Sequence, residues 1–217
     1  MATIAPLKGF DTALDMRRQA GALRRQGYDF VIRYDSHNPA RNLTPGEARS
    51  LCGAGLRIGA VRESAGTHAG YFSRQQGVLD GAAALAQARA AGQPTGSAIY
   101  FAVDYDATRA GIDAPVSAYF SGVRAALNGA AGYRLGVYGS GLCCGAMLDR
   151  GLASLSWRSQ SGGFCGSRDY AQAMRHDLIQ SLGTRLSLDG AALEIDPDAS
   201  NPQRGPEHDP GLFLLAA

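Results

Sequence analysis

Acidic side chains stand at the ends of four short apolar segments that are expected to be parallel β-strands. These acidic residues are Asp11, Glu63, Asp104, Asp106 and Asp196. In a parallel α/β barrel, the C-terminal ends of the strands meet at one mouth, where such proteins carry out their chemistry. Carboxylates brought together there repel each other, so a protonated acid lies beside an ionised partner near neutral pH. The sequence therefore predicts the kind of pair that cleaves a glycosidic bond.

Asp104 and Asp106 are two residues apart in the segment Val103-Asp104-Tyr105-Asp106. If the strand continues through both, their side chains lie on one face, about 6.6 Å apart along it. We therefore expect both carboxylates to face the same pocket.

The remaining acids invite a structural explanation as well as a catalytic one. A lone Asp after a strand, such as Asp11, is more often a helix N-cap than a catalyst. Glu63 is the hardest to explain in this way, because no helix is expected to start directly after it. Asp196 shares a strand face with Glu194, and Pro197 is expected to end that strand and turn Asp196 into the mouth.

Metal binding and a serine nucleophile are two other chemistries that the sequence could support. The acids could hold Mg²⁺ or Ca²⁺ for phosphoester chemistry, because hard cations prefer oxygen ligands. However, the four histidines show no His-x-His or His-Glu-x-x-His spacing, and no glycine-rich phosphate loop precedes a helix with lysine. Gly139-Ser140-Gly141 is not the Gly-x-Ser-x-Gly elbow of serine hydrolases. We therefore expect neither a metal nor another cofactor.

Aromatic and polar residues near the same strand ends are candidates for binding a substrate. They are Arg33, Tyr34, Tyr105, Tyr138, Trp157 and Gln180. An aromatic ring can stack on a sugar and a phenol can hydrogen-bond its hydroxyls, although strands also favour aromatics for packing alone. Arg33 could pair with the acids or contact an anionic group, and Gln180 would offer neutral hydrogen bonds.

Strand-like and helix-like segments alternate along most of the chain, which predicts an α/β fold with a parallel sheet. The expected strands are 7–10, 30–34, 57–61, 98–103, 134–138, 155–157, 177–180 and 193–195. The expected helices are 15–26, 45–54, 72–91, 115–127 and 142–150, with a weaker one at 168–174. Thr44-Pro45-Gly46-Glu47 predicts a helix start with a capping box. Eight strands favour a single (β/α)8 TIM-type barrel over residues 1–200, which could be irregular in 151–192. An open doubly wound sheet is the alternative.

Composition sets the broad class of the protein. The chain has 217 residues, 45% of them hydrophobic and 18% charged, with a net charge of +2. This is a folded globular chain, and its charge gives no argument for nucleic acid or an anionic membrane. The four cysteines are expected to be reduced thiols. No signal peptide and no membrane span are expected. Residues 201–217 are expected to form a C-terminal tail, in which 201–210 lie over the surface and the apolar residues 212–215 either dock on the barrel or simply end the chain.

At its acidic strand ends the sequence resembles the glycoside-hydrolase-like family labelled domain of unknown function 1906, a relative of glycoside hydrolase family 25 lysozymes. The matching pieces are Gly9-Phe10-Asp11-Thr12, Asn42-Leu43-Thr44, residues 96–106 and Gly136-Val137-Tyr138-Gly139-Ser140. They span roughly residues 7–198. The resemblance implies a TIM-type barrel that cleaves β-1,4 bonds in peptidoglycan or a similar polysaccharide without a cofactor.

The resemblance also implies roles for single residues. Asp11 resembles the first-strand acid and Asp104 the first acid of the lysozymes' Asp-x-Glu. Asp106 then stands where those lysozymes have their general-acid Glu, which is a departure because aspartate is one methylene shorter. Asp196 resembles the last-strand acid of the lysozymes, and Glu63 the third-strand acid of the glycoside-hydrolase-like family.

The resulting hypothesis is a muramidase-like hydrolase in which Asp104, Asp106 and Glu63 share the acid and stabiliser roles while Asp11 and Asp196 tune and orient them. The alternative is a catalytically inactive barrel that binds glycan or cell wall. We expect a monomer made in the cytoplasm that acts at the cell wall or periplasm after non-classical export or phage-type release. Its partner would be peptidoglycan or a related polysaccharide, and an immunity or secretion protein would be a second kind of partner.

Overall fold

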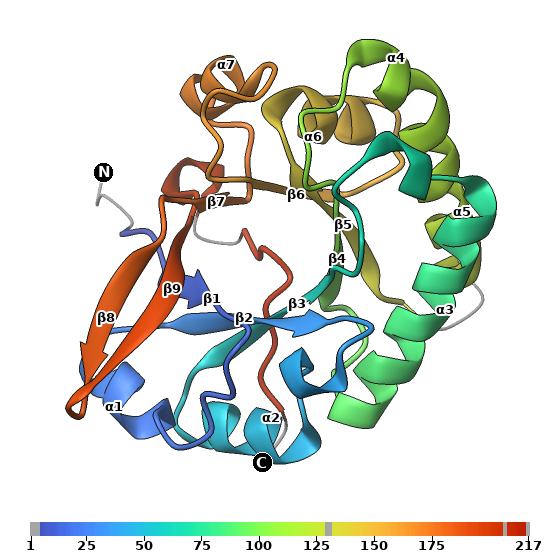
Figure 1. Ribbon diagram of the computed structural model, residues 1–217. Coiled ribbons are helices and arrows are strands. Elements are labelled where there is room, and N and C mark those ends of the chain that lie inside the picture. Colours follow the sequence, from blue (N-terminus) through green and yellow to red (C-terminus); the bar gives the residue numbers. More distant parts are fainter. Residues whose placement is uncertain (1–4, 129–131, 206–207, 216–217) are drawn as a thin grey trace.

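The computed structural model describes residues 5–128, 132–205 and 208–215, and within them eight strands close into a barrel (Figure 1). Around the ring the order is β1-β2-β3-β4-β5-β6-β7-β9, and β9 pairs back with β1. The strands are β1 Lys8–Asp11, β2 Phe30–Asp35, β3 Arg57–Arg62, β4 Ala98–Ala102, β5 Arg134–Gly139, β6 Leu155–Arg158, β7 Leu178–Gln180, β8 Thr184–Leu188 and β9 Ala191–Ser200. The predicted α/β fold with a TIM-type barrel is confirmed.

The helices lie outside the barrel wall (Figure 1). They are α1 Ala20–Arg25, α2 Pro45–Gly53, α3 Arg74–Ala91, α4 Arg109–Gly111, α5 Ser117–Asn128, α6 Gly141–Asp149 and α7 Ser167–Gln172, with short turns of 3-10 helix at Pro39–Arg41, Ala69–Tyr71 and Pro202–Arg204 and of π-helix at Ile112–Val116. The Thr44 side chain caps α2 by accepting from the backbone N–H of Glu47. The Glu47 carboxylate does not complete the expected capping box, because it binds Arg33 and the Met16 N–H instead.

Strand residues alternate between a layer inside the barrel and a layer under the helices. Aromatic rings such as Phe30, Tyr100 and Trp157 fill the interior. Two strand glycines make this possible: a Cβ on Gly9 would lie 2.4 Å from the Phe30 ring, and one on Gly136 would lie 2.4 Å from the Tyr100 ring. The interior is therefore a packed core, and the space left for chemistry is at its mouth.

The last strand of the ring departs from the expected parallel pattern. β9 runs antiparallel to both β1 and β7, because no crossover helix precedes it. Instead, β8 and β9 form a hairpin that projects from the ring beside α1 (Figure 1). Its turn residues Asp189 and Gly190 both have positive φ, of 47° and 83°, as a two-residue type I′ turn requires.

The segment at 208–215 crosses the N-terminal end of the barrel, where it is drawn in red through the ring in Figure 1. The Phe213 N–H donates to the Ile58 carbonyl (2.9 Å), and the Tyr100 hydroxyl donates to the Pro210 carbonyl (2.7 Å). Leu212 and Phe213 are buried. These residues close the floor of the barrel, so of the two alternatives for the apolar residues 212–215 the structure shows docking on the barrel.

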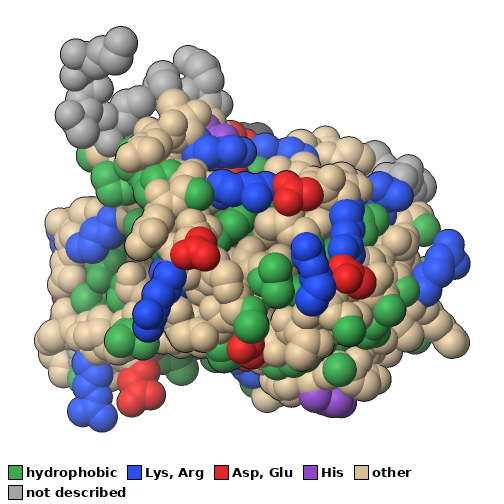
Figure 2. Space-filling view, turned by 90° about the horizontal axis from the view of Figure 1, so that it is seen from above, with side chains coloured by type: hydrophobic (Ala, Val, Ile, Leu, Met, Phe, Trp, Pro, Cys, Tyr) green, Lys and Arg blue, Asp and Glu red, His purple; other side chains and the backbone are tan. Residues whose placement is uncertain are grey.

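Two further observations bear on the class of protein. No helix among the described residues is long and apolar enough to cross a membrane. Figure 2 shows that acidic and basic side chains are interspersed on the face that lies at the top of Figure 1. That face therefore presents no patch of a single sign.

Candidate active site

The centre of the candidate site is Asp11, which lies at the end of β1 and is almost fully buried. The Tyr34 hydroxyl donates to its Oδ1 (2.5 Å), and the Gln180 amide donates to its Oδ2 (2.6 Å). The Tyr138 hydroxyl donates in turn to Gln180 Oε1 (2.8 Å). Burial raises the pKa of Asp11 to about 7 even though these donors favour its charged form. Four strands of the barrel thus converge on one carboxyl group.

Asp198 lies one layer deeper than Asp11, at the position of β9 that pairs with Gly9 of β1. Its Oδ1 accepts from Trp157 Nε1 (2.8 Å), whereas its buried Oδ2 has no donor among the described residues. Burial and the charge of Asp11 raise the pKa of Asp198 well above its ordinary value. The protonated form of Asp198 is therefore favoured beneath the hydrogen-bonded carboxyl of Asp11.

Glu63 and Asp104 follow β3 and β4 and belong to the same acidic centre. The Glu63 N–H donates to the Asp35 carbonyl (3.0 Å), and the Asp104 N–H donates to the Gly66 carbonyl (2.8 Å). Burial raises the pKa of Glu63 to about 7, aided by the charge of Asp104 and opposed by Arg41. Burial also raises the pKa of Asp104. At neutral pH, Glu63 is thus able to both hold and release a proton.

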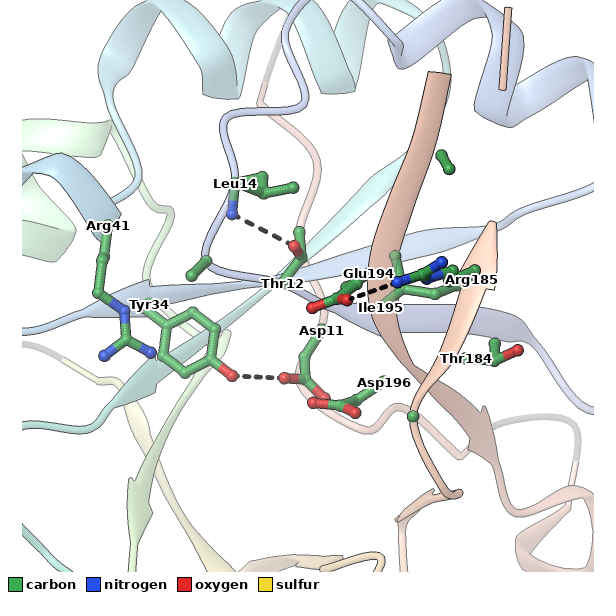
Figure 3. Close-up of a pocket in the computed structure, with 13 residues that line it drawn as sticks. Asp11, Thr12, Leu14, Tyr34, Arg41, Thr184, Arg185, Glu194, Ile195 and Asp196 are labelled. Carbon is green, nitrogen blue, oxygen red and sulfur yellow. Dashed lines mark hydrogen bonds and ion pairs between the residues drawn. The ribbon is translucent and has the colours of Figure 1, made fainter. Parts of the chain in front are cut away.

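Asp196 joins this centre because β9 enters the barrel at the mouth. In the antiparallel pair it lies directly opposite Asp11, and Figure 3 shows the two carboxyl groups pointing toward one another. Burial and the charge of Asp104 raise the pKa of Asp196. A Cβ on Gly183 would lie 2.6 Å from its Oδ1, so the loop before β8 fits closely over this carboxylate.

A cleft of about 950 Å³ leads from Asp11 and Asp196 to the β8–β9 hairpin (Figure 3). Arg185 and Glu194 line it from the hairpin, where they form an exposed ion pair (3.7 Å). On the other side, the guanidinium of Arg41 stacks over the Tyr34 ring at 4.8 Å. The cleft is open enough for a sugar chain and has the acidic centre at one end.

The structure brings Asp11, Glu63, Asp104 and Asp196 together, but it turns Asp106 away. β4 ends at Ala102, so the expected strand face shared by Asp104 and Asp106 does not form. Asp106 is exposed, and its Oδ1 accepts from the Cys165 N–H (2.8 Å) in the loop before α7. The shared-face prediction was wrong because the chain leaves the sheet two residues before Asp104.

Three of the predicted substrate-binding residues lie elsewhere. Arg33 is fully buried on the outer face of β2, where its Nε donates to Glu47 (2.7 Å). Tyr105 packs against Phe72 under the loop after β4, with ring centroids 5.7 Å apart. Trp157 is only 2% exposed, so it cannot offer a stacking face to a sugar. Tyr34, Tyr138 and Gln180 do reach the acidic centre.

Two residues of the site were missed by the sequence reasoning. Asp198 follows Asp196 at strand spacing, but the prediction that Pro197 ends the strand leaves it out. In the structure the Pro197 carbonyl accepts from the Ser181 N–H (2.7 Å) within β9. Arg41 directly precedes the Asn42-Leu43-Thr44 segment, yet no pattern singled it out. Among the described residues, no group of three or more His, Cys, Asp or Glu side chains is arranged to hold a metal ion.

Comparison with known families decides the relationship. The model of the Rv2525c-like, glycoside hydrolase-like domain matches residues 21–199. The chain belongs to this family. The protein FadG of Bacillus subtilis (strain 168) is 31% identical to the chain over 187 residues, which is 83% of this chain and 32% of FadG. The chain spans about a third of the length of the curated relatives it matches.

Solved structures share the barrel of this glycoside hydrolase-like domain. The Tat-secreted protein Rv2525c of Mycobacterium tuberculosis, solved with L-tartrate, has a TM-score of 0.71 at 21% identity, over 89% of this chain and 94% of that one. The modular autolysin LytC of Streptococcus pneumoniae, solved with a synthetic peptidoglycan ligand, has a TM-score of 0.63 at 11% identity, over 92% of this chain and 47% of that one. Because these sequence identities are low, the structural similarity establishes a shared fold and nothing further.

Proposed function

We propose that this domain is a lysozyme-like glycosidase that cleaves β-1,4 glycosidic bonds in peptidoglycan or a related polysaccharide. The observation that carries the proposal is the hydrogen-bonded carboxyl of Asp11 in the wall of the cleft, together with Glu63, which feels the charge of Asp11; burial raises the pKa of both to about 7. Glycosidases need one protonated and one ionised carboxyl on either side of the scissile bond. Membership of a glycoside hydrolase-like family and the fold shared with LytC support it.

In this proposal Glu63 donates the proton to the leaving oxygen. Its partial burial and the neighbouring charge of Asp104 keep it protonated near neutral pH, where an ordinary glutamate would be ionised. Glu63 thus takes the role that the lysozyme pattern would give to Asp106. Asp104 remains the nearby carboxylate that stabilises positive charge on the sugar.

Asp11 would be the second charged group of the reaction. Tyr34 donates to one of its oxygens and Gln180 to the other, so both oxygens are fixed in direction before a substrate arrives. A carboxylate held in this way can stabilise the sugar cation, or orient a reacting group, without reorganising. Asp196 lies opposite and would complete the acidic wall of the cleft.

The second candidate function is a barrel that binds cell-wall glycan without cleaving it. The observation that favours it is Asp106, which stands at the position of the lysozymes' general acid but is bound to the Cys165 N–H outside the centre. In either case we propose that the domain acts at the cell wall or periplasm. The relative Rv2525c is described as Tat-secreted.

A digest of purified peptidoglycan, with the products identified by mass spectrometry, tests the proposal. We expect new reducing ends from the wild-type chain and none from Asp104→Asn. Asp106→Asn is the matched control, since it makes the same chemical change two residues away at an exposed position. Binding without released reducing ends, unchanged by Asp104→Asn, would reject hydrolysis in favour of the binding barrel.

A further inference from the structure

Arg41 is a cation built into the wall of the cleft. It ends the turn Pro39–Arg41, which is capped by the Asn38 side chain. The Asn42 side chain then fastens the loop, because its Oδ1 accepts from the Ser36 N–H (2.8 Å) and its Nδ2 donates to the Ser36 carbonyl (3.0 Å). The loop therefore holds Arg41 in place over Tyr34 without help from a ligand.

The guanidinium of Arg41 has no hydrogen-bond partner among the residues that the structure describes. Nine other arginines form ion pairs in the part of the chain that the structure describes, but Arg41 forms none there. Its Nε is buried and has no acceptor among the same residues. A buried donor without an acceptor is costly, and a guanidinium recognises a carboxylate through two parallel hydrogen bonds. The half-buried guanidinium of Arg41, whose N–H groups form a fork, therefore has no acceptor among the described residues, and a ligand can supply one.

The position of Arg41 relates it to the acidic centre. Its guanidinium stacks on the ring of Tyr34, whose hydroxyl donates to Asp11, and both residues line the same cleft (Figure 3). Its charge is also felt by Glu63. A negative group placed against Arg41 therefore lies in the same cleft as Asp11 and Asp196, whose carboxylates repel it from the rest of the floor.

We infer that the cleft selects an anionic glycan and that Arg41 binds a carboxylate carried by the sugar next to the scissile bond. This rests on the proposed function for the kind of ligand, but not on turnover. A neutral polymer of N-acetylated sugars leaves the Arg41 fork without an acceptor. A glycan whose amino sugar bears a carboxylate-ended ether supplies one, and replacement by lysine would keep the charge but lose the fork.

The test compares two forms of one glycan. Peptide-free strands of alternating N-acetylglucosamine and N-acetylmuramic acid are measured by calorimetry before and after carbodiimide amidation of their carboxylates, in an Asp104→Asn background that blocks turnover. We expect the carboxylate form to bind at least tenfold more tightly than the amidated form. Arg41→Gln should bind both forms alike, and Arg41→Lys should fall between.

Arg49→Gln is the matched control, because Arg49 is an exposed arginine on α2 and loses the same charge. It should keep the full preference, and thermal melts should show all variants folded. Equal affinity for the two forms, no binding of either, or an unchanged preference in Arg41→Gln would overturn the inference. Cleavage by the wild type with no such preference would reject the role of Arg41 but keep the hydrolase, whereas preference without cleavage would do the reverse.

Discussion

Both ends of the barrel bury an aspartate, but only at the N-terminal end does the buried carboxylate lie beside cationic side chains. At the N-terminal end, Asp177 is fully buried but accepts from the Ser156 N–H (2.6 Å) and lies within 3.1 Å of Arg204 and 2.7 Å of His208. At the mouth, Asp11 and Asp198 are buried with no ion-pair partner among the described residues, and burial raises the pKa of both. Paired charge at the floor serves stability, whereas unpaired carboxyls at the mouth remain available for chemistry.

The largest expected effect at the mouth is on rate. Glu63→Gln removes the proposed proton donor, so kcat should fall by about 10² to 10⁴-fold. The fold should be as stable as the wild type or more stable at pH 8, because an amide does not pay the desolvation cost of a buried carboxylate. Turnover of peptidoglycan and urea unfolding check the two parts. A variant that loses activity only because it is unfolded would contradict this division of roles.

At the floor of the barrel we expect a substitution to lower stability and leave activity unchanged. Asp177→Asn leaves Arg204 and His208 without their anion and weakens the bond to Ser156, which should lower the free energy of unfolding by about 1.5–3 kcal/mol. Turnover by the folded fraction should be unchanged. Urea unfolding together with a peptidoglycan assay measures both. A large loss of kcat in the folded variant would mean that the two ends are not separate.

A change of one pH unit should alter the activity by less than the Glu63→Gln substitution does. Glu63 must be protonated to act as the acid, so activity should fall about tenfold for each pH unit above its pKa of about 7. Stability follows the same group. Its pKa rises from 4.5 to about 7 on folding, so the folded state binds more protons and the free energy of unfolding falls as pH rises between these values.

Glu63→Gln should flatten part of this decline, because glutamine does not titrate. Unfolding in urea at pH 4.5, 6 and 8 gives the slope for the wild type and the variant. Parallel slopes for the two chains would show that Glu63 is not perturbed in the folded state.

Much of the barrel was predictable because helix caps and short apolar strands are local signals. The β8–β9 hairpin was missed although Asp189-Gly190 is a strong turn signal, since the expectation of a parallel sheet left no place for it. The sequence predicts that Pro197 ends its strand, yet β9 continues to Ser200. Because that strand continues, it brings Asp198 inside the ring.

Some of the predicted substrate-binding residues lie away from the site for a different reason. Arg33 and Tyr34 are neighbours in one strand and must face opposite sides, so only one of them can reach the mouth. Trp157 does face inward, but it lies too deep to touch a ligand and binds Asp198. Alternation settles the face of a residue, whereas its depth depends on how far the strand extends, which is the least certain part of a sequence-based prediction.

The hairpin also determines how the length of the cleft can vary. Its pairs, from Thr184 with Ile195 to Leu188 with Ala191, lie outside the ring, while β9 pairs with β1 and β7 only from Asp196 onward. Two residues added to each arm would lengthen the wall and leave Asp196 and Asp198 facing inward, because the strand period is two. The length of the cleft is therefore adjustable without rebuilding its acidic centre.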